Sequence, residues 1–264
     1  MPLGDRIQRI QLLYDLTFQT PFHCGTGLRS GLIDRTIVRD AEGYLYVPGS
    51  TIKGALRMHC EGLSRFYEQA DEEMRERIDS PHNMKKVLWG MGSRTTMVTR
   101  IFGSQHHPGH LFFDDAYQTE QDKQQYDSKE RDGKGKYQGL QTDLYTQVRL
   151  HRPTRTAMTG ALYTSEFGIK GFTFKGSIIG WLECIPIETL DDEPTYSLLL
   201  LLGSLHMLDR LGGNRSTGKG RCRCNLTHFL INGEPCTEEQ WKPWLDRLDI
   251  LSSYPLIAEN PEEV

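Results

Sequence analysis

The chain has 264 residues, which is enough for one large domain with insertions or for two small ones. Its net charge of −4 argues against a free-standing nucleic-acid binder if the charge is evenly spread, because such domains carry a basic excess. No apolar stretch is long enough to cross a bilayer, and six thinly spread cysteines without a signal peptide indicate a reduced compartment. We therefore expect a cytoplasmic protein without a membrane partner.

The N-terminal half predicts a long strand, a loop and a helix. Residues 7–20 alternate as a strand does, and a glycine-rich loop follows over 22–34. Ser50 is a good N-cap, and apolar residues at helical spacing predict a helix over 51–68. Residues 69–110 are charged and then mixed, with a proline and paired glycines, so we expect them to form a lid insertion.

The C-terminal half predicts further strands around one apolar helix. Residues 111–117 form a compact strand pattern, 144–155 and 161–164 alternate around an exposed basic arm at 152–160, and 170–183 form a strong strand pattern. The leucine stripe of 198–208 predicts a core helix that begins near Thr195. Residues 232–264 are predicted to be an acidic C-terminal extension.

This order of elements predicts an α+β fold. Strands and two helices that alternate in this way favour an antiparallel sheet with helices packed on one side. That is the ferredoxin-like arrangement that many RNA-binding modules share.

Charge is segregated along the chain. Basic residues dominate 144–181 and 210–223, whereas 114–132 and 234–264 are rich in acid. Within 144–181 the only acidic residue is Glu166. A basic face opposite an acidic one is therefore expected, in spite of the negative net charge of the whole chain.

The segment 212–221 combines four glycines with three cations, a composition that suits phosphate binding. Its spacing fits a nucleotide-binding P-loop, but Gly220 stands where that motif needs Ser or Thr, and a helix precedes the loop where a strand should. A nucleic-acid backbone is therefore favoured over a mononucleotide, and a plain glycine turn that ends the helix is the alternative. The candidate contacts in this loop are Gly213, Asn214, Arg215, Ser216, Thr217, Gly218, Lys219 and Arg221.

Three stretches, 25–34, 46–57 and 212–220, together resemble the RAMP superfamily. The resemblance is to the repeated backbone subunit of type III CRISPR effector complexes, and it extends from about residue 7 to residue 231. It implies a single RAMP domain with a ferredoxin-like (RRM-like) palm, a lid insertion and a β-hairpin thumb over about 144–175.

The resemblance also implies partners and RNA contacts. Copies or paralogues of the chain would stack with other subunits along a guide CRISPR RNA, and each thumb would wedge into the duplex with target RNA. Met158 is then the candidate wedge. Besides the glycine loop, the implied RNA contacts are Arg29, Lys53, Arg57, Arg152 and Arg155.

Target-cleaving members of the family use one aspartate in the loop after the first strand, with a divalent metal, and Asp34 occupies that position. A displaced nucleotide can align its own 2′-OH with the scissile phosphate, so one carboxylate that holds Mg²⁺ or Mn²⁺ or takes the proton suffices. The resemblance thus implies an endoribonuclease that is active within a complex. From the residues alone, Asp34 could instead pair with Arg35 or cap a turn.

Other functions stay open. One aspartate is ambiguous, so a non-cleaving scaffold or capping subunit is the main alternative. A guide-precursor processing endonuclease would use His23 as its acid–base group. A P-loop NTPase is disfavoured by Gly220.

A structural zinc ion is a further candidate cofactor. Its ligands would come from Cys60, His106, His107 and His110. Pro108 lies between the histidines and excludes a helix that would place them on one face. The set therefore lacks a complete zinc pattern.

Overall fold

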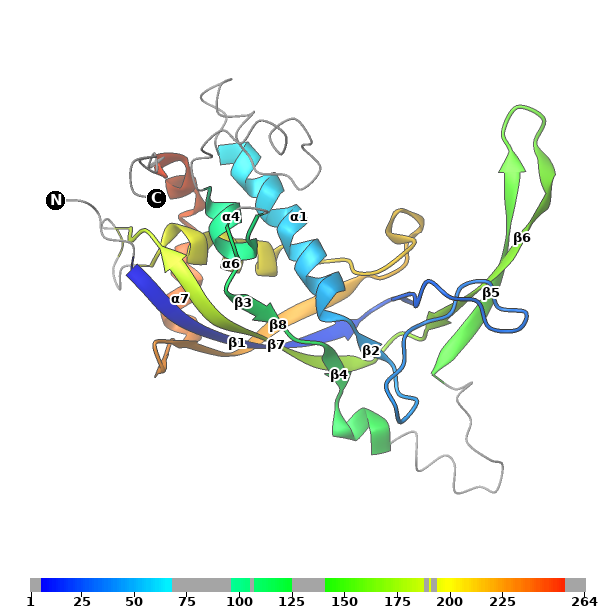
Figure 1. The fold of residues 1–264 in the computed structure, drawn as a ribbon, viewed down its shortest axis with the longest axis horizontal. Helices are drawn as coiled ribbons and strands as arrows, with labels where there is room; N and C mark the ends of the chain where they lie inside the picture. The colour runs from blue at the N-terminus through cyan, green and yellow to red at the C-terminus, as the bar shows by residue number, and fades with distance from the viewer. Residues whose placement is uncertain are drawn as a thin grey trace.

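The computed structural model describes residues 6–67, 96–104, 107–124, 141–187, 190 and 194–254. They form a seven-stranded antiparallel sheet and a separate two-stranded hairpin that projects away from it (Figure 1). The sheet and its helices are here called the palm, and the hairpin is called the thumb.

Three long strands form the centre of the palm. They are β1 (Arg6–Phe18), β7 (Thr173–Cys184) and β8 (Cys222–Ile231), and β1 lies between the other two, antiparallel to both. Alternate side chains of β1, from Ile10 to Phe18, are buried because successive strand residues point to opposite faces. The predicted first strand is confirmed.

Short strands complete the sheet, in the order β2-β4-β7-β1-β8-β9, and β3 also pairs with β7. The strand predicted over 111–117 is split in two, β3 and β4, by Asp114 and Asp115. The bounds are β2 (Tyr46–Val47), β3 (Leu111–Phe113), β4 (Ala116–Gln118) and β9 (Glu234–Pro235).

Three helices cover the buried face: α1 (Gly49–Tyr67), α4 (Met97–Phe102) and α6 (Tyr196–His206). The chain order β1, α1, β3 with β4, β7, α6, β8 has β7 and β1 between the outer strands, which is the ferredoxin-like arrangement. The predicted α+β fold with an antiparallel sheet is therefore confirmed.

Two helix predictions need adjustment. Helix α1 begins at Gly49, whose N–H donates to Asp115 Oδ1 at 2.7 Å, so Ser50 lies in the first turn and the predicted N-cap is wrong. All six residues of α4 are buried, so this part of the predicted lid belongs to the core. Residues 68–95, 105 and 106 of the lid lie outside the described residues.

The first part of the predicted C-terminal extension completes the core. Helix α7 (Glu238–Leu245) contacts α6, and Trp244 is buried. The 3-10 helix η3 (Leu248–Ser253) buries Leu251. Residues 255–264 lie outside the described part of the chain.

The thumb consists of β5 (Thr142–His151) and β6 (Thr156–Gly168), which pair with each other as a two-stranded sheet. The predicted thumb of 144–175 is too long at its C-terminal end, because Thr173 already belongs to β7 in the palm. Gly168 joins the thumb to the palm through two backbone bonds with Phe22, of 2.8 and 3.1 Å.

Candidate nucleic-acid interface

Three segments that are far apart in the sequence line one pocket of about 530 Å³. They are the loop of 23–36 after β1, the first turns of α1, and the start of the glycine loop at 211–215. Asp34 and Arg215 both line this pocket. The structure therefore brings together the two loops that the sequence singled out.

The glycines dock their loop onto the end of β1. Gly212 has φ of 84°, and a Cβ there would lie 2.5 Å from the carbonyl oxygen of His23. The next N–H, of Gly213, donates to the same oxygen at 2.8 Å. At the other end of the loop, Gly220 donates to Pro21 O at 2.8 Å. The docking leaves Arg215, Ser216, Thr217 and Gly218 exposed at the tip.

Lys219 and Arg221 differ from the tip residues. The Lys219 ammonium lies over the ring of Tyr145, 4.0 Å from its centroid, and 5.4 Å from that of Phe167. This cation–π contact connects the glycine loop to the root of the thumb. Arg221 is exposed and lies outside the residues that line the pocket.

Asp34 is held by the thumb. Its Oδ2 accepts a hydrogen bond from the Thr164 N–H at 2.9 Å, and its Oδ1 lies 3.7 Å from Nε of the exposed Arg29. The carboxylate is 32% exposed, so it stays accessible to a ligand. Arg35, the partner considered from the sequence, donates instead to Asn214 Oδ1 at 3.1 Å.

His23 presents a neutral acceptor at the pocket wall. Its Nδ1 lies 2.6 Å from the Glu166 carbonyl oxygen, which can only accept, so Nδ1 carries the proton and Nε2 is the acceptor. Burial is the main cause that lowers the pKa of His23, and the nearby Arg35 also lowers it, against the opposing effect of Glu166. Nε2 lies next to Gly25, and both residues line the pocket, where His23 is 4% exposed.

Comparison with known proteins identifies the family. The sequence profile of the RAMP superfamily matches residues 15–223. The chain belongs to the RAMP superfamily. No curated protein matches the sequence.

Two cryo-EM structures are similar in fold to this RAMP protein. A chain of Type III-B Cmr-beta bound to cognate target RNA has 12% identity and a TM-score of 0.48, and a chain of Type III-B Cmr-beta in the apo state has 13% and 0.47. Both matches cover 82% of the present chain, and they cover 96% and 97% of the solved chains. At these identities the likeness concerns the fold alone.

Lys53 and Arg57 of the RAMP domain lie away from the pocket. The pocket side of α1 carries Gly54 and Met58. Lys53 Nζ lies 5.5 Å from the centroid of the Phe113 ring, and Arg57 pairs with Glu61 at 3.0 Å. The structure thus does not bring these two cations together with the glycine loop.

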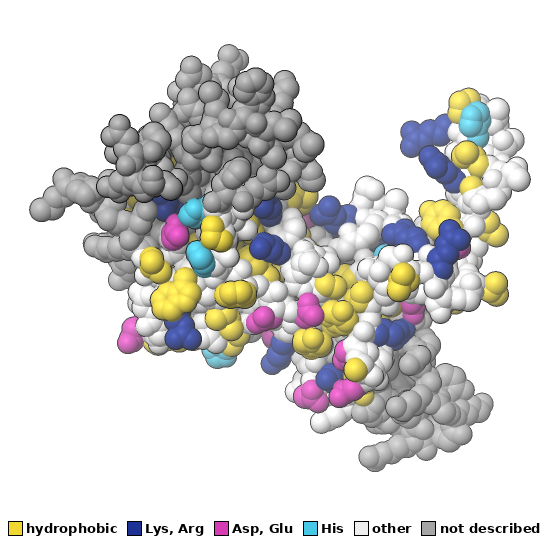
Figure 2. Space-filling view, in the orientation of Figure 1, with side chains coloured by type: hydrophobic (Ala, Val, Ile, Leu, Met, Phe, Trp, Pro, Cys, Tyr) yellow, Lys and Arg dark blue, Asp and Glu magenta, His cyan; other side chains and the backbone are white. Residues whose placement is uncertain are grey.

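The other predicted RNA contacts lie at the free end of the thumb. Arg152 and Arg155 lie in the turn between β5 and β6, and Met158 follows in β6 and is 42% exposed. Figure 2 shows basic and hydrophobic side chains side by side on this projecting hairpin. The exposed apolar residues of the thumb are Leu144, Val148, Leu150, Met158 and Leu162.

The candidate zinc ligands are dispersed. The buried Cys60 thiol donates to the Leu200 carbonyl at 3.7 Å, whereas His107 Nε2 lies 3.2 Å from Glu183 Oε2 and His110 Nε2 lies 4.0 Å from Oε1. His106 is outside the described residues. Among those that are described, no three His, Cys, Asp or Glu side chains are grouped as metal ligands.

Buried thiols serve packing. Burial raises the pKa of the Cys24, Cys60, Cys222 and Cys224 thiols to about 12. These thiols are therefore protonated near neutral pH. No helix of the described chain is long and apolar enough to span a membrane.

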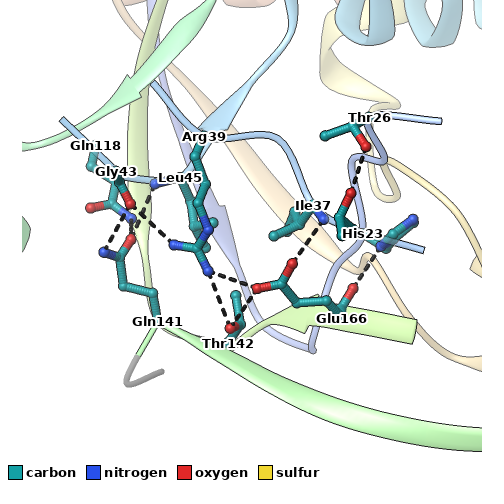
Figure 3. A network of polar contacts seen from close by, with 11 residues as sticks. His23, Thr26, Ile37, Arg39, Gly43, Leu45, Gln118, Gln141, Thr142 and Glu166 are labelled. Atoms are coloured by element: carbon teal, nitrogen blue, oxygen red, sulfur yellow. Dashed lines mark hydrogen bonds and ion pairs between the residues drawn. The ribbon is translucent and has the colours of Figure 1, made fainter. Parts of the chain in front are cut away.

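Sequence reasoning missed a buried polar network at the root of the thumb (Figure 3). The Glu166 carboxylate accepts hydrogen bonds from the Ile37 N–H at 3.0 Å, Arg39 Nη2 at 2.7 Å and Thr142 Oγ1 at 2.9 Å. Burial raises the pKa of Glu166, but these hydrogen bonds outweigh burial and hold the pKa below its ordinary value. The signal in the sequence was a single acidic residue within a basic stretch.

A second part of the network centres on Gln141. Its Oε1 accepts from the Leu45 N–H at 3.1 Å and from Gln118 Nε2 at 3.2 Å. Gln141 is 5% exposed and immediately precedes β5. It therefore connects the thumb to the palm, at the end of the network that lies opposite His23 (Figure 3).

Proposed function

We propose that this RAMP protein is a guide-RNA-binding backbone subunit of a type III CRISPR complex that cleaves complementary target RNA through Asp34. The observation that carries the proposal is the single pocket that Asp34 shares with the glycine loop and the start of α1. Its partners would be the guide CRISPR RNA, the target RNA and further subunits, including copies or paralogues of this chain.

The pocket suits an RNA backbone. Arg35 and Arg215 line it, and the first turn of α1, which is fully described, holds no acidic residue that would oppose an anion. The N-terminal end of a helix carries a partial positive charge that favours phosphate. His23 Nε2, an acceptor, complements a ribose 2′-OH, which is a donor that DNA lacks.

Asp34 suits the cleavage of a strand that supplies its own nucleophile. The 2′-oxygen loses its proton and attacks the adjacent phosphorus, the bond to the 5′-oxygen breaks, and that oxygen takes up a proton. Thr164 donates to Oδ2 of Asp34, and Oδ1, which has the exposed Arg29 as its neighbour at 3.7 Å, can accept the proton or contact a cation. One carboxylate fits Mg²⁺ or Mn²⁺, which proteins often hold through one or two carboxylates and substrate phosphates, and such an ion would neutralise charge on the phosphate.

The isosteric D34N variant tests this proposal in the assembled complex with guide RNA and complementary target RNA. We expect target cleavage to fall by about 100-fold or more, because one positioned acid–base group contributes that much. Target binding and the guide RNA that copurifies should stay as in the wild type. Unchanged cleavage by the D34N complex would show that the catalytic assignment is wrong.

The wild-type complex decides between this proposal and its alternatives. A scaffold or capping subunit would leave the target whole with either Mg²⁺ or Mn²⁺. His23 favours a further alternative, because a neutral imidazole with its Nε2 at the pocket wall can act as a general base. A guide-precursor endonuclease of that kind would cut repeat RNA as an isolated protein in the presence of a chelator.

A further inference from the structure

The loop that carries Asp34 is an addition to the thumb. The Asp34 and Arg35 N–H groups both donate to Thr164 O, at 2.9 and 3.2 Å, and the Glu166 N–H donates to Arg35 O at 2.9 Å. Arg35 and Ser165 form a parallel bridge. Residues 34–37 therefore run beside β6 as a short parallel strand.

Glu166 completes this ladder with its side chain. Regular parallel pairing would direct the Ile37 N–H to the carbonyl oxygen of Glu166. His23 Nδ1 occupies that oxygen at 2.6 Å, and the Glu166 carboxylate accepts the Ile37 N–H instead, through Oε2 at 3.0 Å. Glu166 therefore accepts from both His23 Nδ1 and the Ile37 N–H, at the point where the loop leaves the thumb.

The other carboxylate oxygen extends the connection. Oε1 accepts from Arg39 Nη2 at 2.7 Å and from Thr142 Oγ1 at 2.9 Å, so Glu166 holds the far end of the loop and the root of β5 together (Figure 3). Glu166 is only 8% exposed, and hydrogen bonds to a charged group are stronger where water is excluded. Glu166 does not itself line the pocket.

We propose that Glu166 is a positioning residue that attaches Asp34 to the thumb, so that the carboxylate and the hairpin move as one unit. The cut then falls at a constant place relative to the thumb. This inference rests on the proposed function, because it concerns where Asp34 acts on a bound target.

The E166Q variant tests it. Gln keeps the size of the side chain, but its amide nitrogen cannot accept, so at least one of the bonds to Ile37, Arg39 and Thr142 is lost. In the complex, hydrogen exchange of the Ile37 and Thr164 amides should become faster by about tenfold or more. Cleavage of the target should spread to nucleotides beside the wild-type cut, whereas D34N removes the cut altogether.

Q141M is the matched control. Met has a similar size and removes the side-chain hydrogen bonds to Leu45, Gln118 and Gly43, which hold the thumb to the palm without contacting 34–37. Q141M should lower the melting temperature as E166Q does, yet it should keep the wild-type cut positions and the slow exchange of Thr164. If Q141M spreads the cuts equally, general loosening of the thumb explains the effect and Glu166 has no special role.

The remaining outcomes are also decisive. Wild-type cut positions and wild-type exchange in E166Q would overturn the inference. If no preparation cleaves RNA, the proposed function fails, and the exchange of Thr164 still decides whether Glu166 holds the Asp34 loop. If E166Q does not fold, the double variant R39M/E166Q removes the charge pair together, which avoids a buried unpaired charge, and it enters the same two assays.

Discussion

The palm and the thumb are each stabilised by different kinds of interaction. The palm buries apolar side chains from β1, β7 and three helices in one core. Of the described thumb residues, none in β5 is buried, and in β6 only the last four are. A two-stranded hairpin is marginally stable by itself, so the thumb depends on contacts at its root, which are the polar network and the fully buried Phe167. The palm therefore supplies the buried core of the fold, whereas the thumb presents mainly exposed side chains.

The largest expected effect on stability comes from the palm. Leu200 is fully buried in α6, so L200A should lower the free energy of unfolding by about 2–5 kcal/mol. Leu144 on the thumb is 59% exposed, and L144A should change the free energy by less than about 0.5 kcal/mol. Urea denaturation measures both. Equal losses would show that the thumb shares the core of the palm.

An intermediate effect on the free energy of unfolding is expected from the protonation of His23, which lies where the palm meets the thumb. The folded state lowers the pKa of His23 below its ordinary value of 6.5, so its contribution to stability is complete above that pH and is lost as pH falls towards the folded pKa. H23Q should therefore reduce the slope of stability against pH just below 6.5, by at most about 1.4 kcal/mol per pH unit. Thermal melting over this pH range gives the slope.

Glu166 contributes to the pH dependence of stability at lower pH than His23 does. Its pKa is lowered from 4.5, so its contribution is present above that value and is lost as pH falls through the folded pKa. His59, whose pKa is also lowered by burial, keeps its own share of the slope in H23Q. An unchanged slope in H23Q would mean that folding does not lower the pKa of His23.

The smallest effect is expected where the glycine loop meets the thumb. K219M removes the ammonium from the Tyr145 ring and should cost about 0.5–1 kcal/mol, as a partly exposed cation–π contact does. R221M removes a cation of the same loop, and this guanidinium lies over no described aromatic ring. R221M should therefore lower the free energy of unfolding by less than K219M does. The difference in melting temperature between the two variants isolates the stacked contact. No difference would argue that the loop and the thumb are uncoupled.

The glycine loop could be predicted from the sequence because its requirements are local. Gly212 and Gly220 mark a loop that only glycine can form where it meets the backbone of other segments, and such positions are visible in composition. The order of strands and helices was visible for the same reason, since strand alternation and the leucine stripe are local patterns. The position of Lys53 on the side of α1 away from the pocket could not be predicted, because helical spacing does not say which polar face lies next to the pocket.

The root of the thumb was hidden from the sequence. The Glu166 carboxylate accepts a hydrogen bond from the backbone N–H of Ile37, which lies 129 residues earlier. The two residues come together only in the folded chain, so no local pattern reveals this contact. The acidic composition of 234–264 similarly concealed Trp244 and Leu251, which are buried in the core. Composition describes the solvated residues of such a segment, whereas a few apolar side chains decide where it packs.

The pocket wall also has a chemical consequence through Cys24. With a pKa of about 12, this thiol is almost entirely protonated at neutral pH, and the thiolate is the form that oxidants and alkylating agents attack. The thiol is 3% exposed, which further limits access. The pocket wall should therefore keep its shape through an oxidative burst that would convert a reactive cysteine to a sulfenic acid.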